Sequence, residues 1–184
     1  MKKPILSLFF TLSIFMIQCK KDSQLVEEPL VEIAEEEVIT SLIIHLHRTD
    51  IPGDTMSFAF RDTDGPGGNP PSEVDTIQLA SNGQYACSLE VLDESNDVTR
   101  DITIEILAEA QDHLFCFESI GTPIVFDRTD WDGMYEIGLQ SAWTASNAGT
   151  GEVRIVLKHQ PGIKNGTCEP GETDIEVYLP LVVE

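Results

Sequence analysis

Basic side chains are scarce in this sequence. Of its 184 residues, 11 are lysine or arginine and 32 are aspartate or glutamate, which gives a formal net charge of −21 at pH 7. A charge this negative repels the phosphates of nucleic acids and the headgroups of anionic lipids. No nucleic-acid partner is therefore expected, and the composition favours cations, cationic partners or plain solubility.

Catalytic signatures are also missing. The sequence contains no Gly-x-Ser-x-Gly, no Walker loop and no His-Glu-x-x-His. Ser119, which lies two residues before Gly121, belongs to no such motif. Carboxylates are so numerous that a pair meeting by chance would carry no diagnostic value. We therefore expect a binding protein rather than an enzyme.

Long apolar runs are absent except at the N-terminus. The run from Ile5 to Ile17 is shorter than the ~20 apolar residues that span a bilayer. Lys2 and Lys3 precede it. A short apolar run behind basic residues is typical of a secretion signal rather than of a membrane-spanning helix.

Cys19 closes this run, and residues 19–22 read Cys-Lys-Lys-Asp. This arrangement resembles the lipobox of bacterial lipoproteins, above all those of the Bacteroidota. Gln18 stands where a small residue usually precedes the cysteine, but the alternative, ordinary signal-peptidase cleavage, lacks a small-x-small site. The resemblance implies a signal peptide at residues 1–18, lipidation of Cys19, and an outer-membrane location on the periplasmic face or the cell surface. Each buried methylene of a lipid adds ~0.8 kcal/mol of membrane affinity, so such an anchor holds firmly.

An acidic spacer follows the predicted lipid. Residues 19–37 are rich in glutamate and contain no aromatic side chain, which predicts a disordered linker. Because Lys2 and Lys3 belong to the signal, removing residues 1–18 leaves 166 residues with 32 acidic and 9 basic side chains, a formal charge of −23. Residues 38–184 are long enough for one domain with its own core.

Strand-like alternation begins at Val38. Turn-forming clusters of Gly, Pro and Asn divide the segments, and Asn82 with Gly83 predicts a hairpin turn. The predicted strands are Ile39–Arg48, Thr55–Phe60, Val74–Leu79, Gln84–Leu92, Leu114–Glu118, Pro123–Phe126, Tyr135–Thr144, Gly151–His159 and Thr173–Val183. Eight or nine short strands at this spacing predict a mainly β fold, an immunoglobulin-like β-sandwich.

One stretch departs from the strand pattern. Apolar residues at helical spacing, including Ile102 and Ile106, predict a short amphipathic helix at about residues 99–113 that crosses the domain. Asp101 and Thr99 are the candidate caps for its start. His113 would end this helix, where the helix dipole favours a cationic imidazole.

Cysteine is rare, and no two cysteines have the Cys-x-x-Cys spacing. Beyond Cys19 there are Cys87, Cys116 and Cys168. An exported compartment permits disulfides, but three cysteines leave at least one unpaired. A bridge and a set of buried thiols remain equal alternatives, because Cys87 and Cys116 both lie in apolar, strand-like runs.

Two acidic loops are candidate calcium sites. The candidate ligands are Asp62, Asp64 and Asn69 in the first loop, and Asp127, Asp130 and Asp132 in the second. Ca²⁺ takes 6–8 oxygen ligands, and alternating aspartates with glycine in a tight turn supply them. The alternative is that these residues make turns by bonding their own backbone, since neither loop matches an EF-hand.

Histidines and aromatic residues offer two further candidate sites. His45 and His47 share one strand face about 7 Å apart, a spacing that suits Zn²⁺ or Cu²⁺, although two ligands do not complete a site. His113 and His159 are further candidate metal ligands. Trp131 and Tyr135, with Trp143 nearby, would form a ligand-stacking surface if exposed; the alternative is that they belong to the core.

Four segments together carry a resemblance to a group of small Bacteroidota lipoproteins. They are residues 60–69, 109–113, 157–161 and 171–177, and the resemblance covers most of residues 38–184. Some members carry a label for the type 1 periplasmic-binding fold, which requires alternating βα units over a longer chain. We expect a lipid-anchored binding or accessory module of the envelope, and the resemblance implies that its protein partner belongs to an outer-membrane transport or assembly system. The alternative is a metal-binding lipoprotein that uses the acidic loops for Ca²⁺ or the histidines for Zn²⁺ or Cu²⁺.

Overall fold

The computed structural model describes residues 37–184. The predicted signal peptide, Cys19 and the spacer up to residue 36 lie outside this part of the chain. Within it, no helix has the length and apolar character needed to cross a membrane.

The larger of two sheets has the strand order β3-β2-β1-β5-β9-β8, with β6 paired to β5. Its strands are β1 (Ser41–Arg48), β2 (Thr55–Arg61), β3 (Glu73–Val74), β5 (Gln84–Asp93), β6 (Arg100–Asp101), β8 (Ile124–Arg128) and β9 (Gln140–Ala145). All neighbours in this sheet are antiparallel.

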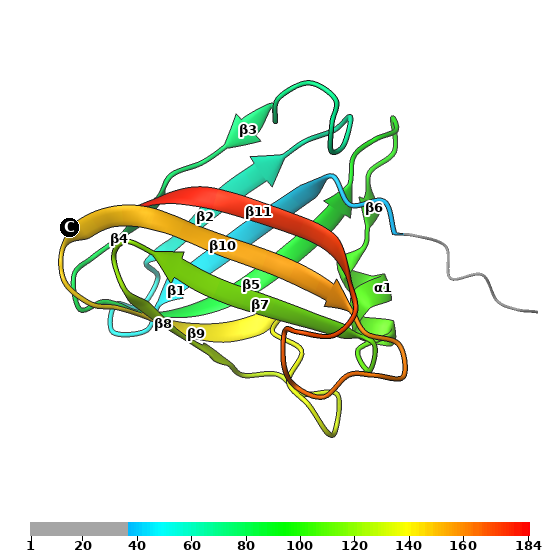
Figure 1. The fold of residues 1–184 in the computed structure, drawn as a ribbon. Coiled ribbons are helices and arrows are strands. Elements are labelled where there is room, and N and C mark those ends of the chain that lie inside the picture. The colour runs from blue at the N-terminus through cyan, green and yellow to red at the C-terminus, as the bar shows by residue number, and fades with distance from the viewer. Residues whose placement is uncertain (1–36) are drawn as a thin grey trace, which may run out of the picture. The chain divides into compact units, whose positions relative to one another are not determined.

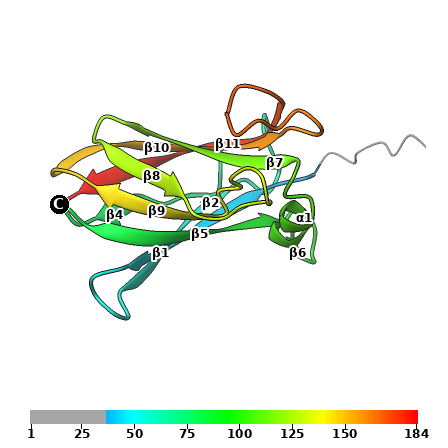
Figure 2. The same ribbon diagram turned by 90° about the horizontal axis from the view of Figure 1, so that it is seen from below.

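The smaller sheet has the order β4-β11-β10-β7. Its strands are β4 (Ile77–Leu79), β7 (His113–Ile120), β10 (Gly149–His159) and β11 (Glu172–Val183). Its neighbours are antiparallel except β4 and β11, which run parallel. Figures 1 and 2 show the two sheets stacked face to face, with α1 (Thr103–Ala108) at one end. The predicted mainly β sandwich with one short helix is confirmed.

The core lies between the sheets because strand residues alternate between the two faces. Leu42, Ile44 and Leu46 of β1 are buried on the inner face, and every second residue of β5 is buried beside them. Trp143 of β9 is also fully buried, so it is a core residue rather than part of a ligand surface. Burial of each such large apolar side chain contributes roughly 1.5–3 kcal/mol.

The helix is shorter than predicted. Residues 109–112 form turns, and His113 begins β7, so the prediction that His113 ends the helix is wrong. The cause is cross-strand pairing: His113 lies opposite His159 in the ladder between β7 and β10. The N-cap residue is Ile102, and it makes no side-chain cap hydrogen bond, so the prediction that Asp101 caps the helix is wrong. The Asp101 carboxylate does accept a hydrogen bond from the Thr103 N–H.

Three strand predictions also need correction. The segment Val74–Leu79 divides into β3 and β4, which belong to different sheets. Asp75 ends the pairing with β2 by binding the Ala59 backbone through both its N–H and its carboxylate. The turn at Asn82, with φ of 58°, therefore connects the two sheets instead of closing a hairpin. The segment from Tyr135 becomes a strand only at Gln140.

A disulfide joins Cys116 of β7 to Cys168 in the β10–β11 connection, and Cys87 is free and buried. Cys116 belongs to a small buried cluster with Leu114 and Val156, separate from the main core. The bridge holds the connection against this cluster.

Candidate binding site

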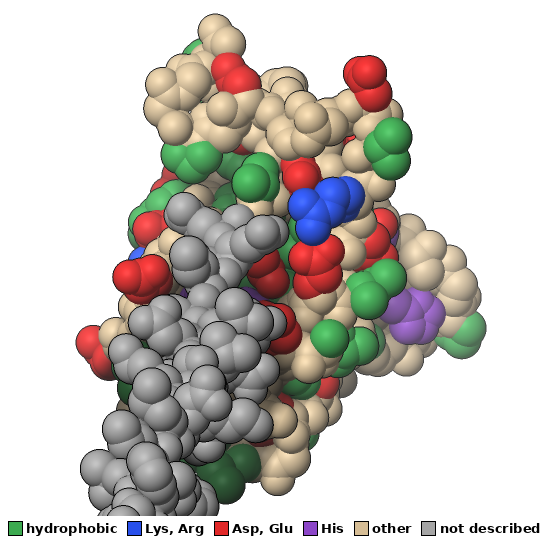
Figure 3. All heavy atoms as spheres, turned by 90° about the vertical axis from the view of Figure 1, so that its right-hand side faces the viewer, with side chains coloured by type: hydrophobic (Ala, Val, Ile, Leu, Met, Phe, Trp, Pro, Cys, Tyr) green, Lys and Arg blue, Asp and Glu red, His purple; other side chains and the backbone are tan. Residues whose placement is uncertain are grey.

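A cavity of about 580 Å³ lies at the end of the sandwich where the described chain begins. Its walls come from the residues ahead of β1, the end of β2 with the loop after it, and the start of β11. The lining residues are Glu37, Val38, Ile39, Thr40, Phe60, Asp62, Thr63, Asp64, Gly65, Pro66, Ser95, Thr173, Asp174, Ile175 and Glu176. Figure 3 faces this end of the molecule, and acidic side chains gather on it.

Among residues 37–184, the charged side chains that line the cavity are all acidic. Five carboxylates line it, and no lysine or arginine of this part of the chain does. Glu176 is neutralised by Arg154, whose Nε lies 2.6 Å from Glu176 Oε1. Buried oxygens of Glu37 (Oε2) and Asp62 (Oδ1), by contrast, accept no hydrogen bond. Burying a carboxylate oxygen without a hydrogen-bond donor destabilises the folded protein. A cation or a hydrogen-bond donor bound in this cavity would therefore stabilise it.

The first predicted calcium loop lines this cavity. Burial, followed by a hydrogen bond with the Asp64 carboxyl group, raises the pKa of Asp62. Asp64 Oδ2 accepts hydrogen bonds from the Asn69 backbone N–H at 2.9 Å and from Asn69 Nδ2 at 2.6 Å. The three predicted ligands therefore lie together, but the amide nitrogen of Asn69, not its oxygen, faces the carboxylate. Calcium binding at this loop stays a prediction.

Carboxylates of the second predicted calcium loop bind the protein itself. Asp130 accepts the backbone N–H groups of Gly138 and Gln140. Asp132 accepts two backbone N–H groups and forms a buried ion pair with Lys164, 2.7 Å from Nζ to Oδ2. Asp127 is exposed on β8. Asp130 and Asp132 therefore make the turn-forming bonds of the alternative interpretation, and calcium binding at this loop stays a prediction.

A histidine cluster borders the cavity. The rings of His113 and His159 stack with centroids 4.9 Å apart and planes 9° apart. His113 is only 1% exposed, and its Nδ1 lies 3.1 Å from the carbonyl oxygen of Glu109, the residue that ends α1. Its Nε2 lies 3.8 Å from Glu37 Oε2 and 3.9 Å from Asp174 Oδ2.

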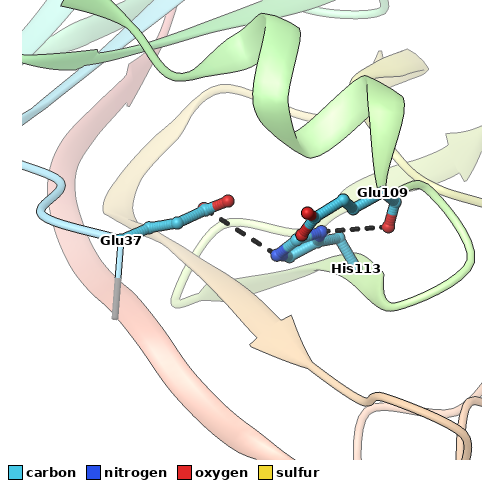
Figure 4. Close-up of side chains that lie close together, drawn as sticks. All are labelled: Glu37, Glu109 and His113. Carbon is cyan, nitrogen blue, oxygen red and sulfur yellow. Dashed lines mark hydrogen bonds and ion pairs between the residues drawn. The ribbon is translucent and has the colours of Figure 1, made fainter. Parts of the chain in front are cut away.

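Glu37, Glu109 and His113 form the one group of three such side chains within residues 37–184 whose ligand atoms all lie within 4.8 Å of one another. Figure 4 shows the carboxylates of Glu37 and Glu109 pointing toward the imidazole. Burial, followed by repulsion from Asp174 and then Glu109, raises the pKa of Glu37 to about 7. Burial also lowers the pKa of His113, so its imidazole is neutral at pH 7.

No family model, curated protein or solved structure matches this chain. The site is therefore described by its own geometry.

The remaining predicted site residues lie away from the cavity. His45 and His47 project from the outer face of β1, where His45 contacts Ser57 Oγ at 2.8 Å and Glu90 Oε2 at 3.0 Å. His47 is exposed. Neither belongs to a group of three ligands among the described residues. Trp131 is 61% exposed and Tyr135 is half-buried in the loop between β8 and β9, so Trp131 is available for contact with a ligand.

Sequence reasoning named His113 but missed its carboxylate neighbours. Glu37, Glu109 and Asp174 lie in three distant segments that meet only after the two sheets pack. Glu37 was the last residue of the predicted spacer, and nothing in the local pattern distinguishes it from the glutamates before it. No signal in a single sequence would have selected these three from 32 acidic residues.

Proposed function

We propose that this protein is an exported, lipid-anchored binding module of the cell envelope whose acidic cavity takes an alkylammonium group. The observation that carries this proposal is the pair of buried carboxylate oxygens, on Glu37 and Asp62, that line one cavity without a hydrogen-bond donor. An ammonium group supplies both a positive charge and three donors.

The size and the mixed lining of the cavity support an organic cation. A volume of about 580 Å³ falls within the range of roughly 300–1,000 Å³ that is usual for small-ligand sites. Phe60, Ile39 and Ile175 supply apolar walls between the carboxylates. A ligand with an apolar chain and a cationic end matches both kinds of wall. The ammonium group would come from a free amine or from a lysine side chain of a partner protein in an outer-membrane transport or assembly system.

An NMR titration of the protein with n-hexylamine and 1-hexanol tests this proposal. The two compounds share an apolar chain and differ in the charged end, so we expect saturable binding of the amine and much weaker binding of the alcohol. Asp62→Asn removes the negative charge of one of the two carboxylates and should weaken amine binding about tenfold or more. Asp127→Asn, the same change on exposed β8, is the matched control and should bind as the wild type does.

Capture from an envelope extract distinguishes the two sources of the ammonium group. A lysine-bearing protein partner should be retained by the wild type and by Asp127→Asn but lost from Asp62→Asn. Equal amine affinity for Asp62→Asn and Asp127→Asn would overturn the proposal, as would equal affinity for the amine and the alcohol.

Membrane attachment rests on the N-terminal sequence. The basic residues, the short apolar run and Cys19 support lipidation, and the charge of −23 gives the mature chain no electrostatic attraction to anionic lipid. Cys19→Ser should move the protein from the membrane to the soluble fraction. If both proteins stay with the membrane, lipidation at Cys19 is wrong.

A further inference from the structure

Beside the proposed ammonium site, we propose a second site: Glu37, Glu109 and His113, with Asp174 as a fourth donor, form a centre for a divalent transition-metal ion, with Zn²⁺ the best match. The two sites share Glu37, so an ammonium group and a metal ion would compete for this carboxylate. This inference does not depend on amine binding, because His113 and Glu109 do not line the cavity.

The donor atoms have the spacing of ligands around one metal ion. Zinc binds nitrogen and oxygen ligands at about 2.0–2.2 Å in tetrahedral geometry, which places neighbouring ligand atoms about 3.4 Å apart. The distances from His113 Nε2 to Glu37 Oε2 and Asp174 Oδ2 are 3.8 and 3.9 Å. These distances are too long for hydrogen bonds and within a few tenths of an ångström of the ligand spacing.

The imidazole is oriented for ligation. A carbonyl oxygen only accepts hydrogen bonds, so the contact between Nδ1 and Glu109 O places the ring proton on Nδ1. The lone pair of Nε2 then faces the carboxylates. Metal-binding histidines commonly donate the other ring N–H to a carbonyl or carboxylate, which fixes the tautomer and the ring plane. Stacking against His159 further limits rotation of this buried ring.

The lone pair and the carboxylates repel one another unless a proton or a metal ion lies between them. Arg100, whose positive charge lowers the pKa of Glu37, already forms ion pairs with Asp93 and Glu105. A metal ion would neutralise the group and would also join the chain ahead of β1, the end of α1 and β11.

The mixture of donors selects the kind of metal. Ca²⁺ and Mg²⁺ take oxygen ligands and gain little from an imidazole, whereas Zn²⁺ binds both nitrogen and carboxylate oxygen. The donor set contains no sulfur, because the described cysteines are either disulfide-bonded or distant in the core.

Isothermal titration of the full chain in detergent with Zn²⁺, and separately with Ca²⁺, tests this proposal. We expect one tight Zn²⁺ per chain. Glu109 is exposed, so Glu109→Gln should fold normally and weaken Zn²⁺ binding at least tenfold. Glu105→Gln, the same change one turn earlier on α1, is the matched control and should leave Zn²⁺ affinity unchanged.

Two further variants separate this site from the other acidic groups. His113→Ala, checked for folding by circular dichroism, should abolish tight Zn²⁺ binding. Asp62→Asn should keep Zn²⁺ binding while amine binding falls, so the metal centre and the ammonium site can fail independently. The proposal is overturned if Zn²⁺ does not saturate at one ion per chain, if Glu109→Gln and Glu105→Gln bind equally, or if Ca²⁺ binds as tightly as Zn²⁺.

Discussion

At the scale of single residues, the buried pair of Lys164 and Asp132 is the strongest local constraint near the site. Their side chains are only 3% and 4% exposed. Lys164 Nζ also donates to the Ala110 carbonyl at 2.8 Å, just beyond α1. The pair thus fixes the β10–β11 connection to the β8–β9 loop and to the chain that leads into His113.

Replacing Lys164 should destabilise the fold severely. Lys164→Met leaves the Asp132 carboxylate buried without its partner, and removal of one member of a buried pair costs about 3–5 kcal/mol. Urea unfolding monitored by tryptophan fluorescence measures the loss. Lys158→Met removes only an exposed hydrogen bond from Lys158 Nζ to Thr173. It should lower the free energy of unfolding by less than about 1 kcal/mol. Equal losses for the two variants would contradict this account.

The same pair makes stability depend on pH. Burial alone would raise the pKa of Asp132, but hydrogen bonds from Lys164 and from two backbone N–H groups outweigh it, so the pKa lies below its ordinary value. A carboxylate with a lowered folded-state pKa stabilises the protein above its unfolded pKa of about 3.9, and this stabilisation is lost as pH falls through the folded-state pKa.

Asp132→Asn should therefore be much less stable than the wild type at pH 7, and the difference should shrink as the pH approaches 3. Urea unfolding of both proteins at several pH values measures the difference. A gap that stayed constant from pH 7 to pH 3 would show that the charge of Asp132 is not what stabilises the loop.

At the scale of elements, the strands with one buried face were predictable and the connections were not. The apolar alternation in β1 and β5 predicted both segments as strands, because each of these strands presents one face to the core. The helix was predicted too long because the apolar spacing of residues 102–110 continues past Ala108, while Ile104 and Leu107 are exposed. Pairing of β7 with β10 is a long-range interaction that no local pattern encodes.

The candidate site was less predictable than the strands for the same reason. Asp62 and His113 were predicted as candidate metal ligands from their own residue types. Aspartate in a glycine-rich turn is typical of calcium loops, and histidine is a common metal ligand. Glu37 and Asp174 gained their importance only from burial, which depends on how the two sheets meet.

The disulfide is the main covalent constraint on the outer face of the smaller sheet. Cys116 and Cys168 are separated by 52 residues in the sequence, and closing a loop of that length stabilises a protein by about 2–4 kcal/mol. The double variant Cys116→Ser/Cys168→Ser should lose stability by that amount in urea unfolding. Dithiothreitol should destabilise the wild type similarly and leave the double variant unchanged; sensitivity of the double variant to the reductant would contradict the assignment.

At the scale of the whole molecule, negative charge is spread over the chain, and five carboxylates line one cavity at an end of the sandwich. The two aspartates of the β8–β9 loop, Asp130 and Asp132, by contrast bind backbone N–H groups or a lysine. Around the cavity, Glu37 and Asp62 keep buried oxygens without donors. The gathering of these carboxylates around one cavity is the reason for placing the ammonium site and the metal centre at this end of the domain, which leads to the proposed anchor.

The most direct test of the central claim is to map where the amine binds. In a ¹H–¹⁵N NMR titration with n-hexylamine, the account predicts saturable shifts concentrated at the amides of Thr40, Thr63 and Thr173, which line the cavity. The amides of the opposite end, such as Asn82 in the β4–β5 turn, should not move. Shifts spread evenly over the acidic surface, or absent from the cavity, would contradict the account.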